Sequence, residues 1–386
     1  MHDSTTQRPH PTPERPEPTW STPPDGQPSS ASGESPVPHP PQTGHHGHGR
    51  HALLDTEPGI PAPVLAAAAG IRKAMVVPVA TALAIGTIFV TVYLAAFHAP
   101  TAHHQPLGIA ASDQVAGHVE VALNDASADA YTFHRYPDAD AARQAITHDR
   151  IPAALVAQGN NMTLLAAGAQ GPSVVSALQA AATHATGHPV PVEDVVPLVA
   201  GDTRGLSVFY ASFGVVLAGF LFSVASYQTA PRLPLAARMA SMTAFAAASG
   251  VMVALIGHQA MAALPASFTT VAAVVGLLAM ATAAAAGVLL RLFGPVGMPV
   301  ASVVLLIFGN ATSGGILPPA YLPSWLSPLS QIMPPAAAVR ALRGAGYFHS
   351  AHLTSSFLVL AGWTLGCLAI QYALDLRATR RTVTAL

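Results

Sequence analysis

Charged side chains are scarce in this sequence of 386 residues. Asp, Glu, Lys and Arg together make up 9% of the chain, whereas about 25% is usual for a soluble domain. Hydrophobic residues make up 51%, and the mean hydropathy is +0.43. The formal net charge is −1, without the basic excess that nucleic acid attracts. The composition is therefore that of a membrane protein and argues against nucleic acid as a partner.

Lysine and cysteine each occur once. A P-loop needs the pattern Gly-x-x-x-x-Gly-Lys-Ser/Thr, whose lysine neutralises phosphates, but Lys73 is followed by Ala74 and lacks that glycine frame. Neither a Gly-x-Ser-x-Gly elbow nor a His-Glu-x-x-His pair is present. Cys367 lies in an apolar run, where we interpret it as an inert small hydrophobe. We expect no catalytic residue, no metal site and no cofactor bound by this chain.

Acidic residues are missing between Thr203 and Leu374. Carriers driven by protons or sodium ions generally place ionisable residues, often carboxylates, inside the bilayer. In the apolar runs of this region His258 is the one ionisable side chain apart from Cys367 and the tyrosines. It either relays protons or bonds a neighbouring helix carbonyl. Transport powered by this chain alone is therefore disfavoured.

Long apolar runs are what the sequence has instead. Six of them reach the ~20 residues that a helix needs to cross the hydrocarbon core. They are Ala74–Phe97, Gly205–Gln228, Met239–Leu264, Ala266–Leu290, Gly297–Leu317 and Leu353–Leu374. The sequence predicts a mainly α membrane protein with six transmembrane helices. An inserted segment separates the first helix from the other five.

Basic residues give the orientation of these helices. They collect on one side of the membrane if both termini are cytoplasmic, as the positive-inside rule requires. The residues concerned are Arg72, Lys73, Arg232, Arg238, Arg291, Arg377, Arg380 and Arg381. The excess of Arg over Lys, with abundant Ala, Gly and Pro, indicates a bacterial genome, so we expect a multi-pass protein of the bacterial cell membrane.

A polar insert, residues 100–204, separates the first two runs and is predicted to be extracytoplasmic. "LGIAAS", "AYTFHRY", "IPAALVA" and "MTLLAAG" have the composition of short strands. "DADAARQAITH", capped by Asp138 or Asp140, and Pro172–Ala185 are predicted to be helices. The insert is therefore a small α/β domain.

Two tails flank the membrane part: residues 1–68, rich in Pro, Ser and His, and residues 377–386. Residues 1–68 contain too few apolar side chains to fold, so we expect a disordered cytoplasmic segment. "GHHGHGRH" (Gly44–His51) either captures a metal ion or reflects composition alone. The Pro-x-x-Pro spacing within Pro9–Pro18 either docks on a partner or is a solvated extension.

The segment 309–346 breaks the helical pattern at the extracytoplasmic side. It carries the pairs Gly314–Gly315, Pro318–Pro319 and Pro334–Pro335, yet it stays apolar. Because prolines exclude one continuous helix, we expect short helical pieces that re-enter the outer leaflet. The last piece is predicted to start near Pro335 and end near Gly344, with Arg340 and Arg343 on one face.

Two stretches resemble a known family. "LSPLSQIMPPAAAVRALRGAGYF" and "EDVVPLVAGDTRGLSVFY", the latter with Asp202, Arg204 and Gly205 before the second run, are similar to ABC-2-type transporter membrane subunits. The layout of one helix, an outer domain and five helices resembles the YhgE/Pip-like (phage infection protein) branch. The resemblance covers residues 74–376, with residues 205–376 as the five-helix domain. It implies a permease half that forms a homo- or heterodimer and uses ATP through a separate cytoplasmic nucleotide-binding subunit.

The resemblance leaves alternatives open. The link Ser226–Met239, with Arg232 and Arg238, either couples to the ATPase or is a short basic turn. Arg340 and Arg343 either meet anionic headgroups or substrate, or anchor the segment at the lipid surface, while the glycine pair is expected to allow close approach between protomers. The chain exports a lipid-like, drug-like or envelope molecule, or it is a non-transporting envelope protein whose outer domain binds a secretion apparatus or a phage. A third hypothesis, a membrane-embedded enzyme, is disfavoured because the sequence contains no catalytic constellation.

Overall fold

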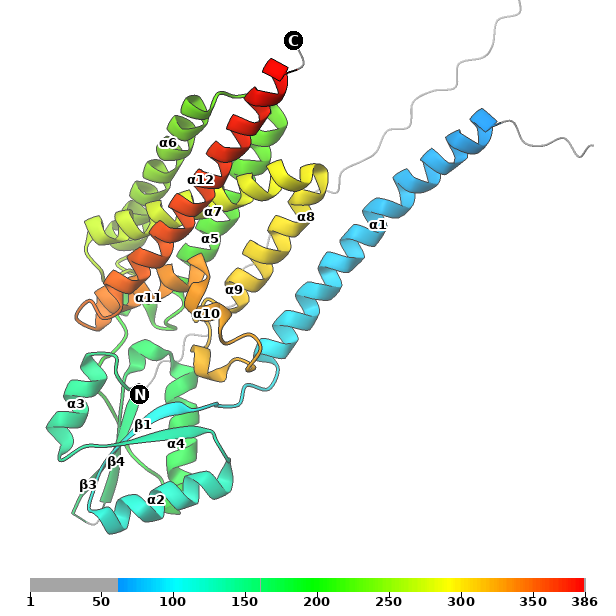
Figure 1. Ribbon diagram of the computed structural model, residues 1–386. Helices are drawn as coiled ribbons and strands as arrows, with labels where there is room; N and C mark the ends of the chain where they lie inside the picture. The colour runs from blue at the N-terminus through cyan, green and yellow to red at the C-terminus, as the bar shows by residue number, and fades with distance from the viewer. Residues whose placement is uncertain (1–61, 160, 385–386) are drawn as a thin grey trace, which may run out of the picture. The chain divides into compact units, whose positions relative to one another are not determined.

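The computed structural model describes residues 62–159 and 161–384, with side chains over 73–159 and 161–377. The described chain forms a helical body and an α/β domain inserted between α1 and α5 (Figure 1). The histidine cluster Gly44–His51 and the proline repeat Pro9–Pro18 lie outside the described residues. So do residues 1–61 of the segment 1–68 that was expected to be disordered. Residues 62–68 of that segment belong to a helix, so the prediction was wrong for them.

Within the described residues, five helical stretches are long and apolar enough to cross a membrane. They are Lys73–Phe97 of α1 (Ala62–Phe97), α5 (Ser207–Thr229), Leu235–Ala260, Phe268–Ala311, and Leu353–Arg377 of α12 (Leu353–Thr384). α1 starts before the predicted Ala74 because the alanine-rich stretch ahead of it favours a helix. α12 continues through most of the tail predicted for residues 377–386. The lengths and composition of these helices are those of a multi-pass membrane protein.

The sequence predicted six spans, and the described residues contain five candidate stretches because two of the predicted apolar runs fall in one stretch of 44 residues. A straight helix of that length would measure about 66 Å, roughly twice the hydrocarbon core. α7 (Phe268–Phe293) instead ends at Gly294, whose φ of +59° turns the chain. α8 (Gly297–Ala301), the π-helical turn Ser302–Phe308 and α9 (Gly309–Ala311) then lead back toward the α/β domain (Figure 1).

The returning arm is Gly297–Ala311, and its first part, α8, packs closely on α7. A Cβ atom on Gly297 would lie 2.3 Å from the carbonyl oxygen of Leu289, so only glycine fits at the turn. The arm measures about 22 Å, less than the ~30 Å of a hydrocarbon core. The residues after α9 must therefore complete any crossing, and these are the residues where the helical pattern breaks.

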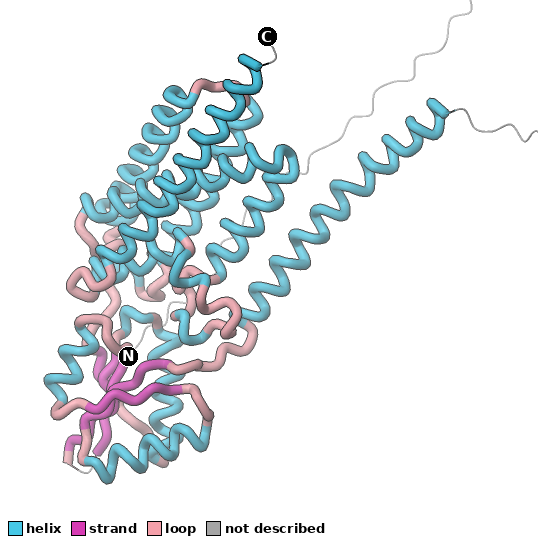
Figure 2. Tube along the Cα trace, in the orientation of Figure 1, coloured by secondary structure: helices cyan, strands magenta, loops and turns pink. Residues whose placement is uncertain are grey.

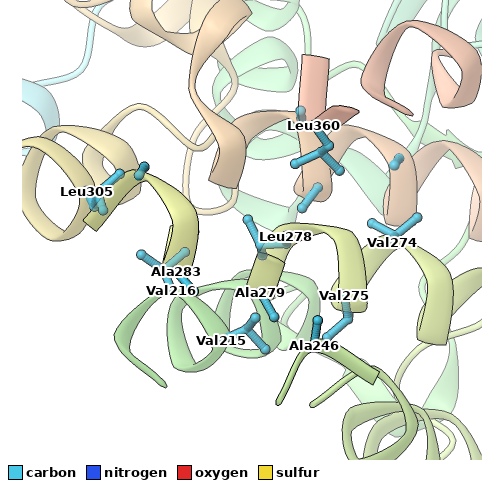
Figure 3. Packing of buried hydrophobic residues seen from close by; sticks show 14 of the residues in the cluster. Val215, Val216, Ala246, Val274, Val275, Leu278, Ala279, Ala283, Leu305 and Leu360 are labelled. Carbon is cyan, nitrogen blue, oxygen red and sulfur yellow. The ribbon is translucent and has the colours of Figure 1, made fainter. Parts of the chain in front are cut away.

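The core of the helical body is α7, which packs against α5, α6 (Leu235–Val253), α11 (Pro334–Tyr347) and α12. Figure 3 shows Val274, Val275 and Leu278 of α7 among residues from the neighbouring helices. Small residues let the backbones approach: a Cβ on Gly250 of α6 would lie 2.3 Å from the carbonyl oxygen of Ala272. The alanine-rich sequence of α7 thus sets the spacing of the bundle.

The α/β domain is a five-stranded sheet in the order β2-β1-β3-β4-β5 with helices beside it. β1 lies parallel to β2 and β3, β3 and β4 form an antiparallel hairpin, and β4 lies parallel to β5. The strands are β1 (Gln105–Ala110), β2 (Tyr131–Arg135), β3 (Ala153–Gln158), β4 (Asn161–Ala166) and β5 (Val192–Asp194). The helices are α2 (Asp113–Ala126), α3 (Ala139–Thr147) and α4 (Pro172–Thr186).

The four predicted strands and both predicted helices of the domain are present, whereas α2 and β5 were not predicted. Asp138, rather than Asp140, caps α3, because its Oδ1 accepts a hydrogen bond of 2.8 Å from the amide of Ala141. In α2 the buried residues Ala116, Val119 and Leu123 recur at helical spacing among exposed polar residues. That periodicity was the available signal for α2.

The segment between α9 and α12 joins the domain to the helical body. Loops gather at this junction, and the strands described are confined to the domain (Figure 2). Tyr321, at the end of the 3-10 turn Pro319–Tyr321, packs into the core of the domain with Leu107 and Leu164. Phe348, directly after α11, is fully buried with Ile146 and Val156. The broken segment is thus a shared part of both cores. We call this end of the helical body the domain end, and the end with residues 230–234 and 294–296 the distal end.

Replacing Gly250 by alanine should lower the thermal unfolding midpoint in detergent, because the new methyl group forces α6 away from α7. Overpacking of this kind costs about 1–3 kcal/mol. Gly366→Ala in α12 is the matched control, since nothing lies within 4 Å of its Cβ position. Alanine there should be neutral or stabilising by about 0.5–1 kcal/mol. Equal shifts for the two variants would contradict the proposed packing.

Candidate functional site

The helix α11 brings the predicted arginines of the broken segment into place. Pro334 and Pro335 are its first two residues, where a fixed φ suits the helix and a missing N–H is not needed. The helix runs to Tyr347, beyond the predicted end at Gly344, and it packs on α5, α7 and α12. Arg340 and Arg343, three residues apart, point their charge toward the segments that precede α11.

Arg343 is buried, with 9% of its surface exposed. Its Nη1 donates to the carbonyl oxygen of Gly314 at 3.1 Å, and its Nη2 to that of Gly315 at 3.4 Å. Gly314 adopts a φ of +74°, and a Cβ on Gly315 would lie 2.6 Å from Cβ of Phe209 on α5. Arg343 therefore holds the turn after α9 inside the protein and does not anchor the segment at a lipid surface. The close approach allowed by Gly315 is to α5 of the same chain.

Arg340 bonds the next break in the chain. Its guanidinium donates to the carbonyl oxygen of Ser330 and, at 3.2 Å, to that of Gln331, both in the short helix α10 (Leu329–Ile332). Nε1 of Trp363 on α12 donates at 2.7 Å to the carbonyl oxygen of Ile332. Carbonyl groups at the end of a helix have no partner within it, so these side chains provide one. Pro318 and Pro319 start the 3-10 turn between the two breaks.

A cavity of about 220 Å³ lies where the α/β domain meets this arginine face. Eight polar or charged side chains line it: Gln105, Asp149, Arg150, Gln170, Ser313, Arg340, Arg343 and His352. Asp149 accepts a 2.5 Å hydrogen bond from Nε2 of Gln170 and faces Nε2 of His352 at 3.6 Å. Burial raises the pKa of the Asp149 carboxyl, against the opposing effect of His352 and Arg343.

The second predicted group, Asp202, Arg204 and Gly205, forms the start of α5. The carboxylate of Asp202 accepts hydrogen bonds from the amides of Leu206 at 3.1 Å and Ser207 at 2.9 Å. Gly205 takes a φ of +68° in the turn that leads into the helix. Arg204 is exposed. This group caps a membrane helix, and it lies at the same end of the helical body as the cavity.

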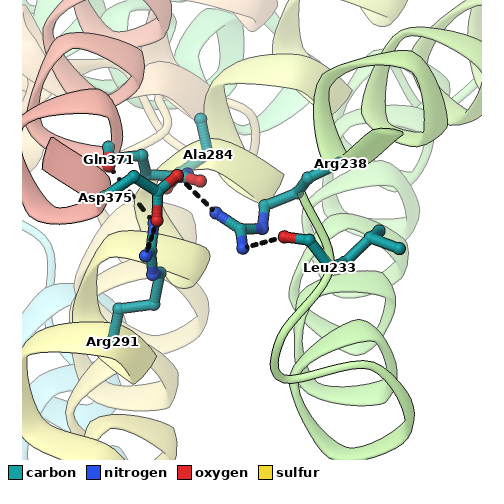
Figure 4. A network of polar contacts seen from close by, with 6 residues as sticks. All are labelled: Leu233, Arg238, Ala284, Arg291, Gln371 and Asp375. Atoms are coloured by element: carbon teal, nitrogen blue, oxygen red, sulfur yellow. Dashed lines mark hydrogen bonds and ion pairs between the residues drawn. The ribbon is translucent and has the colours of Figure 1, made fainter. Parts of the chain in front are cut away.

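The third predicted group lies at the distal end, with Arg232 in the link between α5 and α6 and Arg238 in the first turn of α6. Arg238 donates to the carbonyl oxygen of Leu233 at 2.8 Å and to Asp375 at 3.3 Å, and Arg291 of α7 donates to the same carboxylate (Figure 4). Arg238 thus fastens the link to α12, whereas Arg232 is exposed. Asp375 was not singled out from the sequence, although it is the first acidic residue after Leu374.

His258 lies on the π-helical turn Ala254–Ala260, and its Nδ1 contacts the carbonyl oxygen of Leu264 at 3.0 Å. Leu264 lies in the loop after this turn, so the contact is not the predicted one to a neighbouring helix, and the proton relay stays a prediction. Among the residues that the structure describes, no three His, Cys, Asp or Glu side chains are placed to hold a metal ion.

A scan against protein-family models found no match, and searches of curated proteins and of solved structures found none. The function therefore has to be argued from the geometry of this chain.

Arg343→Gln should destabilise the protein by about 1–3 kcal/mol, because the carbonyl groups of Gly314 and Gly315 would stay buried without a charged donor. The unfolding midpoint in detergent measures the effect. Arg204→Gln is the matched control, since Arg204 is exposed at the same end of the protein. A loss no larger than that of the control would show that Arg343 does not hold the turn.

Proposed function

We propose that this chain is the permease subunit of an ABC-2-type exporter in the YhgE/Pip-like branch. The observation that carries the proposal is the broken segment after α9, which lies inside the protein with its carbonyl groups bonded by Arg340 and Arg343. Irregular backbone at membrane depth is tolerated where protein or a water-filled cavity surrounds it. A segment of this kind, next to a cavity, is suited to the exit of a transport path.

The proposed topology has six crossings, with the returning arm and the residues after it as the fifth. Gly297–Ala311 is too short to cross alone, so Thr312–Leu317 would complete the passage to the domain end. The α/β domain then lies outside, and both termini lie in the cytoplasm of a bacterial cell. Under this topology Arg340 and Arg343 lie on the outer side, where the positive-inside rule disfavours them. Their bonds to backbone carbonyls supply the reason for the exception.

The energy for export would come from a separate cytoplasmic ATPase, because the chain has no P-loop. In this proposal the link of residues 230–234 at the distal end is the coupling element, and exposed Arg232 is its contact residue. Arg238 and Arg291 share Asp375, so a force on the link would reach α7 and α12 together. A dimer of such chains, in contact with membrane lipid, would move a lipid-like, drug-like or envelope molecule outward.

A second candidate is an envelope protein that does not transport, whose domain binds a secretion apparatus or a phage. The observation that favours it is a separate cavity of about 570 Å³ in the α/β domain. Its lining includes His118, Gln158, Met162, His188 and Pro191. This mixture of polar and apolar side chains is suited to a peptide or protein segment.

ATP hydrolysis in liposomes distinguishes the two candidates. The chain would be reconstituted with the nucleotide-binding subunit encoded nearest to it, and hydrolysis would be compared with that of the ATPase alone. We expect a severalfold stimulation that Arg232→Glu removes, because reversing an interface charge adds repulsion. Arg204→Glu, at the domain end, should keep the stimulation. Failure to associate, with a folded chain, would contradict the permease and favour the second candidate.

A further inference from the structure

The cavity at the domain end has an excess of positive charge. Arg150, Arg340 and Arg343 contribute three guanidinium groups against the single carboxylate of Asp149. That carboxylate already has two partners, Gln170 and His352. Arg150 is exposed, so at least one of the three cations meets solvent at the cavity. The charge balance favours an anion over a cation or a neutral ligand.

The arginines that line the cavity retain unused donors. A guanidinium carries five N–H groups. Arg343 directs two nitrogen atoms at the carbonyl groups of Gly314 and Gly315, and Arg340 does the same at Ser330 and Gln331. The bonds to backbone carbonyl groups fix each guanidinium group in place and leave its remaining N–H groups for a ligand. Such fixed guanidinium groups match the oxygen atoms of a phosphate.

Gln105 provides an independent observation. It starts β1, it lines the cavity, and only 4% of its surface is exposed. Its Oε1 is buried without a hydrogen-bond partner among the described residues. A buried acceptor of this kind costs free energy unless a donor reaches it. A ligand hydroxyl would supply the donor, and if the amide is turned over, its Nε2 would donate to the oxygen of the same hydroxyl.

The size of the cavity limits the ligand. The cavity volume of about 220 Å³ is roughly seven times the volume that one water molecule occupies in liquid water. It is smaller than the volume of a typical site for a drug-sized molecule. It therefore suits a headgroup and not a whole lipid. The wall formed by Pro318, Pro319 and Ala320 belongs to the segment that also exposes Ile316 and Trp325, where apolar chains of a lipid could lie.

We infer that this cavity binds a phosphate group with a neighbouring hydroxyl, as in glycerol phosphate, between the arginine face of α11 and Gln105 of the α/β domain. The ligand is either the headgroup of an anionic phospholipid or a free phosphate ester. The site is present whether or not an ATPase partner drives transport, so the inference goes beyond the proposed function.

Binding is tested on the full-length chain in detergent, without any ATPase, by isothermal titration calorimetry. The probes are glycerol 3-phosphate, inorganic phosphate, a short-chain phosphatidylglycerol and the matching phosphatidylcholine. We expect glycerol 3-phosphate or phosphatidylglycerol to bind, and phosphatidylcholine to bind at least tenfold more weakly. Binding of both glycerol probes identifies the headgroup as sufficient, and binding of the lipid alone identifies a lipid site.

Variants assign the binding to the cavity. Arg150→Gln, at an exposed position, should weaken binding by about fivefold or more through the lost charged hydrogen bond. Gln105→Leu should reduce the affinity for glycerol 3-phosphate to that for inorganic phosphate. Arg204→Gln, which is exposed outside the cavity, should change neither. Absence of binding by every probe, or binding that Arg150→Gln leaves unchanged, would overturn the inference. Because no ATPase is present, this result stands apart from the outcome of the hydrolysis experiment.

Discussion

At each break in a helix, backbone carbonyl groups lose their hydrogen-bond partners within the helix. The structure depends on giving these carbonyl groups other donors. A membrane offers them no water, so an unbonded group costs several kcal/mol in hydrocarbon. Arg343 bonds the turn at Gly314 and Gly315, and Arg340 bonds the end of α10. With those bonds made, the chain can leave the helix after α9, turn twice, and contribute Tyr321 and Phe348 to the cores of the α/β domain. The same bonds leave a charged cavity between domain and body.

The two ends of the helical body are joined by shared helices. α12 accepts the bonds of Arg238 and Arg291 at Asp375, and its Trp363 donates to Ile332 beside α11. α7 packs against both α11 and α12. A displacement of the link between α5 and α6 would thus act on helices that also support the broken segment. In an exporter, a cytoplasmic partner at one end has to open an exit at the other end. The shared helices would carry that movement from the distal end to the domain end.

The sequence predicted the apolar runs, four strands, two helices of the domain and the proline start of α11 because each depends on local pattern. It also predicted separate runs Ala266–Leu290 and Gly297–Leu317, and the turn at Gly294 lies between them. It did not predict that the helical stretch would continue through that turn. The bonds of Arg343 to Gly314 and Gly315, 29 and 28 positions earlier in the chain, were not predicted. Asp375 received no role because its partners, Arg238 and Arg291, lie 137 and 84 positions away. Contacts between residues this far apart in the sequence depend on how the helices pack, which the spacing of residue types along the chain does not reveal.

In the proposed topology, the broken segment and the turn at Gly294 lie on opposite sides of a membrane, with the segment outside. Cysteine labelling of intact cells tests it most directly, in a Cys367→Ala background. Ser324→Cys would mark the broken segment, and Val296→Cys, at a position with 62% of its surface exposed, would mark the turn. An impermeant maleimide should label Ser324→Cys in intact cells and Val296→Cys only after permeabilisation. Labelling of both in intact cells would contradict the returning arm as a crossing and the account built on it.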